Sequence, residues 1–541
     1  MTEVPLSTML AFFIYVTIVL FIGLYAYLRT KNATDYFLGG RKLSASVSAV
    51  SAGASDMSGW VLLGLPGYAY IAGLEAAWIS IGLIIGVAAN WIIVAKRLRV
   101  YSSILDDAVT LPTYLQRRFA DHTPWLKVIA SLSILLFFLF YVGSGLIAGG
   151  KLFNEVFGFD YHIAVFVSVA LILFYTFFGG FLAVSWTDVF QGLLMLLALG
   201  CVPVLILSDL GGIGAFTLTI RQINPELLDI FSSADGKSLS GMMIISTMGW
   251  GLGYFGQPHI LARFMAISSA NDTKQATIIG VSWAFICYLL AIMIGLGGVA
   301  YLPEILADSE KVFIALTSLI FHPLIAGILL AAILAAIMST VDSQLLVCSS
   351  SLAEDLYPLV KKTSVSPEKR LHTGRLAVVV LALLATVLAM QPDSKVLDVV
   401  SYAWAGLGAS IGPTILVSLY WSRMTVAGAL SGILVGGSTI ILWSKMTGGI
   451  FDLYALVPGF IFSLAAIFFV SLLGKKTIDS SVIENFEIME QQVSKAMSKK
   501  RADSALFCPA DRTDDFFPAR ALSAGSRAAA PGPRNPPSIG S

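Results

Sequence analysis

The feature of the sequence that most constrains the fold is a long succession of apolar segments separated by short polar stretches. A helix that crosses a membrane needs about 20 mostly apolar residues. Thirteen segments fit this description, and they lie near residues 7–28, 43–72, 76–95, 128–150, 163–180, 184–208, 240–262, 276–300, 323–350, 376–391, 397–421, 425–443 and 455–474. The sequence therefore predicts an all-α polytopic membrane protein with about 13 transmembrane helices.

The composition excludes a soluble enzyme, because the charged residues are too few to cover the surface of a water-soluble chain of this length. They make up 12% of the sequence, against about 25% in an average domain. The net charge of +1 provides no basic field, so no nucleic-acid partner is expected. Cys201, Cys287, Cys348 and Cys508 are far apart, which predicts neither a disulfide framework nor a transition-metal site.

The distribution of Lys and Arg predicts the orientation of the helices, since cytoplasmic loops carry an excess of these residues. With the N-terminus outside, twenty of them fall in inward-facing loops, Arg41 and Arg263 included. Six fall in outward-facing loops, Lys151 included. We therefore expect the N-terminus outside and the C-terminus in the cytoplasm.

Two of the predicted spans are not expected to be helical throughout. The second contains Ser51–Trp60, which is rich in small and polar residues, and the seventh contains Met248–Pro258, with four glycines and a proline. Backbone groups freed by a broken helix in a membrane must line a cavity or bind a ligand. The two spans lie five apart and so run in opposite directions, which is typical of an inverted-repeat transporter. Close packing of membrane helices is the alternative explanation for the glycines.

Polar residues within the apolar segments are candidates for ion binding. Asp56 places a carboxylate in mid-membrane, where acids are functional by default, although neighbouring hydroxyls could also hold it for structural reasons. Ser339, Asp342 and Ser343 share one helix face, and such oxygen-rich clusters suit hard cations. Ordinary hydrogen bonds between neighbouring helices explain these polar side chains equally well. Asp188 could join Asp342 in a second cation or proton site, act in a gate, or favour a helix start.

Aromatic residues beside the interrupted helices are candidates for a solute slot. Tyr141, Trp250 and Tyr254 adjoin glycines or broken helix. Rings in such places form an apolar slot with hydroxyl or indole N–H groups as polar handles. Most other aromatic residues are expected to face lipid or the core.

Several stretches resemble the solute:sodium symporter family, and specifically its proline branch. They are Ser51–Trp60, Gly179–Asp188, Met248–Ala266, Ile333–Thr340, Gln344–Ser350 and Ser401–Ala409. The resemblance extends over roughly residues 7–475 and implies the leucine-transporter fold. The expected divisions are a leading helix and loop (1–42), a first inverted repeat (43–208), a second inverted repeat (209–421), two trailing helices (422–476) and a cytoplasmic tail (477–541).

The resemblance implies import of L-proline coupled to Na⁺ by alternating access, across a bacterial inner membrane. The protein is expected to be surrounded by lipid and to function as a monomer. Neither enzymatic activity nor an organic cofactor is expected. The main alternative is a symporter of the same fold for another small organic solute. A channel is disfavoured because no pore-filter motif repeats, and a sensor because the tail is too short for a kinase.

The resemblance also assigns site residues. It implies that sodium is held by carbonyls of Ala54, Met57 and Ala336 and by hydroxyls of Ser339 and Thr340. Asp56, beside Ser58 and Gly59, matches an aspartate required for sodium-dependent function. Positions linked to the substrate and the outer gate are Tyr141, Trp250, Tyr254 and Pro258.

Further matches concern coupling and gating. Arg41 corresponds to a cytoplasmic-side arginine implicated in coupling, and Asp188 to another functional carboxylate. At Asp342, before Ser343, the chain has an acid where the family pattern has a neutral residue, so the number of sodium ions carried is open. After about 477, residues 479–500 are expected to form a cytoplasmic helix. Beyond about 501 the Ala, Arg, Ser and Pro composition predicts disorder.

Overall fold

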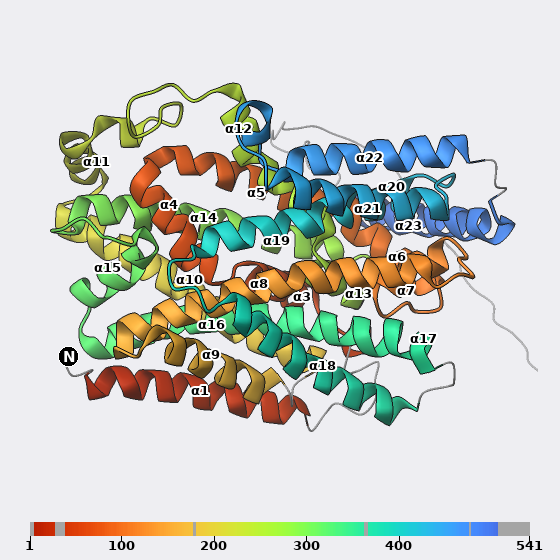
Figure 1. Cartoon of the computed structure of the whole chain (residues 1–541), viewed down its shortest axis with the longest axis horizontal. Coiled ribbons are helices and arrows are strands. Elements are labelled where there is room, and N and C mark those ends of the chain that lie inside the picture. The colour runs from red at the N-terminus through yellow and green to blue at the C-terminus, as the bar shows by residue number, and fades with distance from the viewer. Residues whose placement is uncertain (1–4, 28–37, 177–179, 362–365, 475–477, 507–541) are drawn as a thin grey trace, which may run out of the picture. The chain divides into compact units, whose positions relative to one another are not determined.

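The computed structural model describes residues 5–27, 38–176, 180–361, 366–474 and 478–506. Over these residues it contains helices and no strand, with isolated bridges at Leu43–Ile267 and Ser232–Ser238. Residues 1–496 form one compact unit, and residues 497–541 a second. The first unit, described from here on, is a bundle of helices packed side by side (Figure 1).

The elements of the first half begin with a peripheral helix and continue through most of the predicted spans. They are α1 (Leu6–Tyr27), η1 (Gly39–Arg41), α3 (Ala45–Asp56), η2 (Trp60–Gly64), α4 (Leu65–Ala72), α5 (Ala77–Ala89), η4 (Asn90–Ala95), α6 (Lys96–Ile104), α7 (Leu111–Arg118), α8 (Trp125–Phe157), α9 (Tyr161–Thr176), α10 (Phe181–Leu210) and α11 (Ile213–Ile223).

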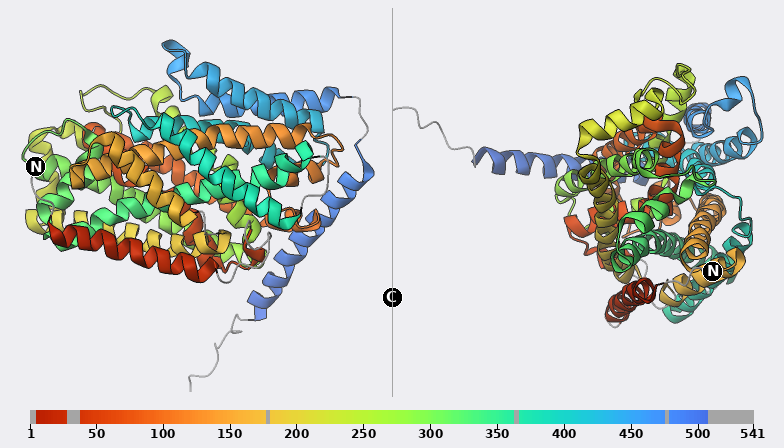
Figure 2. Two further views of the ribbon diagram at one scale, coloured as in Figure 1. Left: turned by 60° about the horizontal axis from the view of Figure 1, so that its bottom comes forward. Right: turned by 90° about the vertical axis from the view of Figure 1, so that its left-hand side faces the viewer.

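The second half contains the other interrupted span, and later a pair of helices that is followed by one last helix. Its elements are α12 (Gly241–Met248), η6 (Gly249–Gly256), α13 (Pro258–Ala266), α14 (Thr273–Tyr301), η7 (Ser309–Lys311), α15 (Val312–Ile320), α16 (Pro323–Ser350), η8 (Ser351–Leu356), α18 (Pro367–Leu388), α19 (Val396–Ser410), α20 (Gly412–Tyr420), α21 (Val426–Trp443), α22 (Leu456–Leu473) and α23 (Ser480–Leu506). Helices α21 and α22 pack against each other (Figure 2).

Within the described residues, ten helices are long and apolar enough to cross a membrane. The predicted count of thirteen is not confirmed by this measure, for three structural reasons. Helical turns from Trp60 to Ile104 join parts of the second and third spans, the apolar part of α9 is short, and the seventh span is broken. The chain is nonetheless the predicted all-α, multi-pass membrane protein.

Both predicted interruptions are present. Helix α3 ends at Asp56, and Met57 leaves the helical conformation with φ −83° and ψ 71°. The seventh span passes from α12 into a 3-10 segment, η6, then through extended Gln257 into α13. Close approach explains the glycines of η6, because a Cβ on Gly253 would lie 1.9 Å from Nε1 of Trp404.

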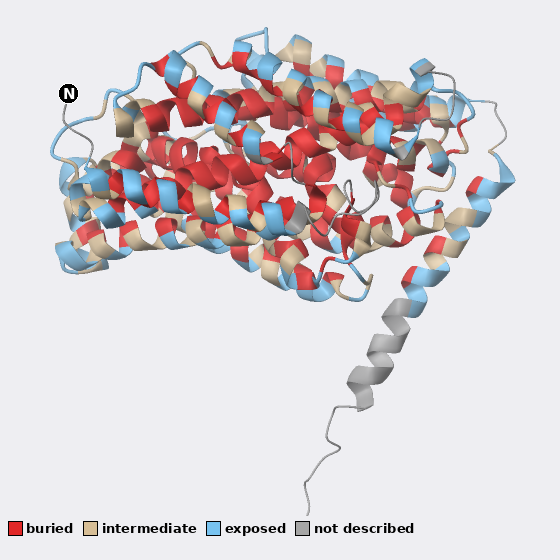
Figure 3. Ribbon diagram, turned by 90° about the horizontal axis from the view of Figure 1, so that it is seen from below, coloured by how far each residue is buried: buried red, intermediate tan, exposed pale blue. Residues whose placement is uncertain are grey.

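The distribution of buried and exposed residues is that expected of a helical bundle surrounded by lipid. Buried residues fill the interior of the bundle and exposed residues lie on its outer faces (Figure 3). Many of the exposed residues are large and apolar. Phe13 and Phe469, for example, are 70% and 67% exposed. Such contiguous apolar surface suits hydrocarbon rather than water.

Several basic residues that the sequence analysis put in loops lie in helices, and two of them have a buried carboxylate partner. Arg263 was expected in an inward loop, but it belongs to α13 and is fully buried. Lys151 was expected in an outward loop, but it belongs to α8 and its side chain is 6% exposed. Each side chain has a carboxylate partner, and ion pairing is what permits a charge to be buried. The tail prediction falls largely on residues 507–541, which lie outside the described residues, and α23 continues to Leu506.

Candidate functional site

Asp56 lies at the end of α3, where the second span breaks, and its side chain is buried. Tyr254 of η6 donates a hydrogen bond to Oδ2 of Asp56, and Tyr288 of α14 donates to the same oxygen at 3.3 Å. The two tyrosine oxygens are 2.6 Å apart. The other carboxylate oxygen, Oδ1, has no hydrogen-bond partner within the described residues. One oxygen is therefore held in place, and the other is available to a ligand.

The break also frees backbone oxygen atoms. The carbonyl of Asp56 accepts hydrogen bonds from Nε1 of Trp60 at 3.2 Å and from the hydroxyl of Tyr141 at 3.4 Å. The amide of Ser58 also donates to it at 3.0 Å, so indole, phenol and a neighbouring amide together replace the N–H of Trp60 that a continuous helix would supply. Beside Asp56 lies a cavity of about 20 Å³, lined also by Met57, Asn90 and Tyr254, which is room for about one water molecule.

Aromatic rings surround the break and form a group that we call the aromatic chamber. Its members are Trp60, Tyr141, Trp250, Tyr254, Tyr288 and Trp404. The ring of Trp60 lies 6.0 Å from that of Trp250 and 5.9 Å from that of Tyr288. Trp404 lies 5.0 Å from Tyr254 and 6.4 Å from Tyr141. Tyr141, Trp250 and Tyr254, which the sequence analysis selected, therefore come together around Asp56.

Three other selected residues have different surroundings. The Oγ of Ser58 lies 3.5 Å from the amide of Trp60, from which it accepts a hydrogen bond. Gly59 packs where a Cβ would meet Ala148 at 2.8 Å, so it permits close contact with α8. Pro258 lines a second small cavity together with Arg263 and Ser343, rather than one that contains Asp56.

The expected sodium ligands bring α3 and α16 into contact. The hydroxyl of Ser339 donates to the carbonyl of Ala54 at 2.9 Å and to that of Ala336 at 3.1 Å. The hydroxyl oxygen of Thr340 is buried and, within the described residues, has no hydrogen-bond partner. Met57 is buried at the same break. The carbonyl and hydroxyl oxygens of these residues are of the kind that hard cations prefer.

A buried charged cluster occupies the neighbouring face of α16. Asp188 of α10 accepts hydrogen bonds from Ser51 at 2.6 Å and from Nη2 of Arg263 at 3.0 Å, through the same oxygen, Oδ2. The same Nη2 donates to Ser343 at 2.6 Å. Asp342, the acid of α16, is buried, and neither of its carboxylate oxygens has a hydrogen-bond partner among the described residues.

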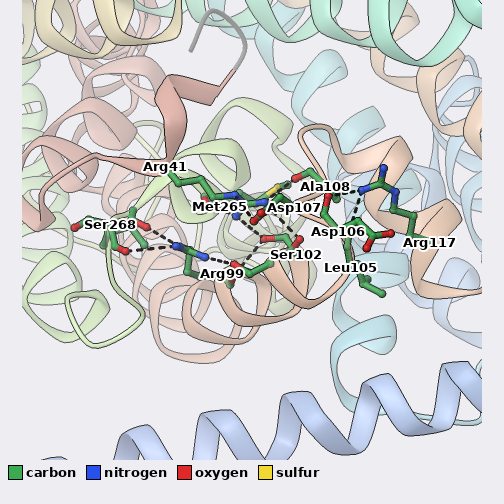
Figure 4. A network of polar contacts seen from close by, with 12 residues as sticks. Arg41, Arg99, Ser102, Leu105, Asp106, Asp107, Ala108, Arg117, Met265 and Ser268 are labelled. Atoms are coloured by element: carbon green, nitrogen blue, oxygen red, sulfur yellow. Dashed lines mark hydrogen bonds and ion pairs between the residues drawn. The ribbon is translucent and has the colours of Figure 1, made fainter. Parts of the chain in front are cut away.

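Arg41 joins the ends of several elements through a network of polar contacts (Figure 4). Its guanidinium donates to the carbonyls of Met265 at 2.8 Å and Ala108 at 2.9 Å and pairs with Asp107 at 3.3 Å. Burial, with a smaller contribution from Arg99, lowers the pKa of Arg41 to about 10. Its side chain therefore stays charged at neutral pH, and it ties the segment before α3 to α13 and to the α6–α7 connection.

Sequence reasoning missed four residues of these sites: Trp60, Tyr288, Trp404 and Arg263. Three are aromatic residues within apolar segments that contain many such residues, so composition gave no reason to select them. Arg263 follows the end of a predicted span and was interpreted as a loop residue. The one signal in the sequence was its position directly after an apolar segment, and that position is also typical of loop residues.

Comparison with known sequences identifies close relatives. A model of the sodium:solute symporter family matches residues 36–436. The chain is 49% identical over 458 residues to the high-affinity proline transporter PutP of Bacillus subtilis (strain 168), covering 84% of this chain and 95% of that protein. It is 47% identical over 474 residues to the sodium/proline symporter of Escherichia coli (strain K12), covering 86% and 93%.

Two solved structures show the same fold. A Na⁺-coupled sialic acid symporter, in a substrate-bound outward-open state, matches with a TM-score of 0.72 at 22% identity, over 87% of this chain and 99% of that chain. Mhp1, a nucleobase-cation-symport-1 family transporter in a closed conformation, matches with a TM-score of 0.53 at 12% identity, over 85% and 99%. Both have the leucine-transporter fold, so the predicted fold class is confirmed.

Proposed function

The chain belongs to the sodium:solute symporter family, and on that premise we propose that it imports L-proline together with Na⁺ by alternating access. It is a transporter and not an enzyme. The observation that carries the proline assignment is identity of 45–49% to proteins named as proline transporters, over 84–88% of this chain. The site geometry supports the assignment, because it offers a cation-binding position beside an aromatic chamber.

The proposed sodium position lies between α3 and α16. Its ligands are the carbonyls of Ala54, Met57 and Ala336 and the hydroxyls of Ser339 and Thr340. The hydroxyl of Ser339 already contacts the first and third of these carbonyls. When sodium enters, this hydroxyl turns its lone pair to the ion. The two carbonyls then lose the hydrogen bond from Ser339 and coordinate the ion instead. Sodium thereby fixes the inner half of the broken second span against α16.

The proposed proline position is the aromatic chamber. Its rings bury the apolar pyrrolidine, and the Tyr141 and Tyr254 hydroxyls and the Trp250 indole supply polar contacts. Asp56, with Ser58 and Gly59 beside it, links the two ligands, because its carboxylate receives Tyr254 of the chamber while its helix carries the sodium carbonyls. Occupation of either position therefore changes the other, which is the requirement for coupling.

The proposed orientation has the N-terminus outside and the C-terminus in the cytoplasm of a bacterial inner membrane. Arg41 and its partners then lie on the cytoplasmic side and close it. Inward release requires these contacts to separate, which assigns Arg41 to the inner gate. The monomer contains every proposed ligand, so we propose it as the functional unit, in direct contact with lipid.

The driving force for one sodium ion is sufficient for strong accumulation. One charge moving through 100 mV releases about 2.3 kcal/mol, and a tenfold sodium gradient adds about 1.4 kcal/mol. Together these support accumulation of proline on the order of 500-fold.

Uptake of radiolabelled L-proline into proteoliposomes tests the proposal directly. We expect uptake against a gradient when sodium is high outside, and none when sodium is replaced by choline. Asp56→Asn should abolish it, whereas Asp235→Asn, which changes an exposed loop carboxylate, should not. Folded protein that takes up no labelled proline, but takes up another labelled small solute when sodium is high outside, would retain the symporter and reject proline as its substrate.

A further inference from the structure

Arg263 occupies the place where the sequence predicted a second cation. That prediction rested on Asp188, Asp342 and Ser343, three oxygen-bearing side chains from two predicted spans. In the structure, Nη2 of Arg263 lies 3.0 Å from Oδ2 of Asp188 and 2.6 Å from the hydroxyl of Ser343. The guanidinium thus contacts two of the three side chains that would have bound the ion.

The remaining hydrogen bonds of the Arg263 guanidinium are of the same chemical kind, and its one aromatic neighbour among the described contacts is the ring of Phe181, 5.1 Å away. Its Nε donates to the hydroxyl of Ser51 at 3.0 Å, and Nη1 donates to the carbonyl of His259 at 2.9 Å. Carboxylate, hydroxyl and carbonyl oxygens are also the ligands that hard cations take. They come from α3, α10, α13 and α16, so the guanidinium joins helices as a bound sodium ion would.

Burial makes this charge a permanent feature of the site. The side chains of Arg263 and Asp188 are both 0% exposed. Removing either partner from a buried ion pair leaves an uncompensated charge, which is strongly unfavourable. A mobile cation that entered beside the guanidinium would also meet like-charge repulsion at close range. Asp188 and Ser343 are therefore not free to take up and release an ion in each cycle.

We propose that Arg263 is a tethered cation that takes the place of a second transported sodium ion, so that each turnover carries one sodium ion with one solute. The inference rests on the proposed sodium-coupled function and adds the number of ions to it. Arg263 acts through Asp188 and does not contact the transported ligands, so it is a positioning residue. If the Arg263 charge were removed, Asp342 would be a further carboxylate available to bind a cation there.

The first test uses the wild-type protein in proteoliposomes at zero membrane potential, clamped with valinomycin and equal potassium. With one sodium ion per proline, a tenfold inward sodium gradient is balanced by about a tenfold opposing proline gradient. With two ions, the balancing gradient is about a hundredfold. Balance near tenfold supports the inference, and balance near a hundredfold overturns it.

The second test compares Arg263→Gln with Arg263→Lys, and with Arg221→Gln as a control outside the site. Removal of the charge exposes Asp188, Asp342, Ser343 and Ser51 to a mobile cation. We expect the sodium Hill coefficient for proline uptake to rise from about 1 toward 2 in Arg263→Gln and to stay near 1 in Arg263→Lys and in the control. A purely structural role would lower the amount of folded protein without changing this coefficient.

The outcomes separate the inference from the function on which it rests. Folded Arg263→Gln that transports with a Hill coefficient of 1 would overturn the inference and leave the symporter intact. If that variant is inactive or unfolded, the wild-type balance decides alone. Wild-type protein with no sodium-dependent proline uptake would overturn the proposed function and the inference together.

Discussion

At the residue scale, the two oxygens of Asp56 have different surroundings. Oδ2 receives hydroxyls from Tyr254 and Tyr288, whereas Oδ1 has no partner among the described residues. An aspartate at the centre of a spanning helix costs about 2.5–3.5 kcal/mol on insertion scales. Two donors on one oxygen reduce that cost and orient the other oxygen. The tyrosines therefore determine where the free oxygen points.

Tyr288→Phe should weaken sodium-coupled uptake while leaving the protein folded. It removes one hydroxyl that donates to Asp56 and leaves the ring, which packs against Trp60, in place. A hydrogen bond to a charged group contributes about 1.5–3 kcal/mol, so we expect the half-saturating sodium concentration to rise about 10- to 100-fold.

The control for this prediction is Tyr420→Phe, which removes a hydroxyl that contacts the backbone of Ile93 far from the break. Its sodium dependence should match that of the wild type. An unchanged sodium requirement in Tyr288→Phe would mean that Tyr288 does not orient Asp56.

The contrast between Asp56 and its partners shows what the sequence could predict at this scale. A carboxylate within an apolar segment is conspicuous, so Asp56 was selected without any structure. Tyr288 is a tyrosine in an apolar helix, and only the packing of α14 against α3 brings it to Asp56. Arg263 was misplaced for a related reason, because an arginine at the edge of an apolar segment is normally a loop residue and its buried partner lies 75 positions away.

At the element scale, a buried ion pair joins three elements on the side of the bundle that carries the N-terminus. Glu310 of η7 accepts from Nζ of Lys151 at 2.6 Å and from the amides of Val396 and Leu397 at 3.0 and 3.1 Å. A carboxylate at the start of α19 also meets the positive end of the helix dipole. The contact lies along α8 about 15 Å from Tyr141. It therefore fastens η7 to α8 and α19 at that end of the bundle.

Glu310→Gln should slow transport more than it weakens binding. The variant loses the charge that holds η7 to α8 and α19, and so it destabilises the closed arrangement that alternating access requires. We expect kcat for proline uptake to fall at least tenfold, with a smaller change in KM. Lys311→Gln, which breaks the more exposed pair with Glu155, should behave as the wild type. Equal changes in both variants would show that the buried contact has no special role.

Gly253→Ala should disrupt the packing of η6 against α19. The added Cβ would lie 1.9 Å from Nε1 of Trp404, which itself donates to the carbonyl of Trp250. Overpacking of this kind typically costs about 1–3 kcal/mol, so we expect a lower melting temperature in detergent and weaker proline binding. Gly241→Ala is the matched control, because nothing lies within 4 Å of its added Cβ. A melting temperature equal to that of the control would contradict the packing of η6.

At the scale of the whole molecule, the architecture could be predicted further than the site. Apolar segment lengths gave the helices, and the small residues of Ser51–Trp60 and Met248–Pro258 marked the two breaks that the structure contains. The number of spans could not be fixed, because helical turns from Trp60 to Ile104 run on without the boundary that hydropathy suggested. The division into repeats at residue 208 remains a prediction.

The whole-molecule account has one central claim: sodium held between α3 and α16 organises the proline site. The most direct measurement is the affinity of the purified protein for radiolabelled L-proline, with and without saturating sodium. We predict at least tenfold tighter binding with sodium, equivalent to about 1.4 kcal/mol of coupling. Thr340→Val should lose most of this gain, whereas Thr439→Val, on an exposed face of α21, should keep it. Proline affinity that is equal with and without sodium in folded wild-type protein would contradict the account.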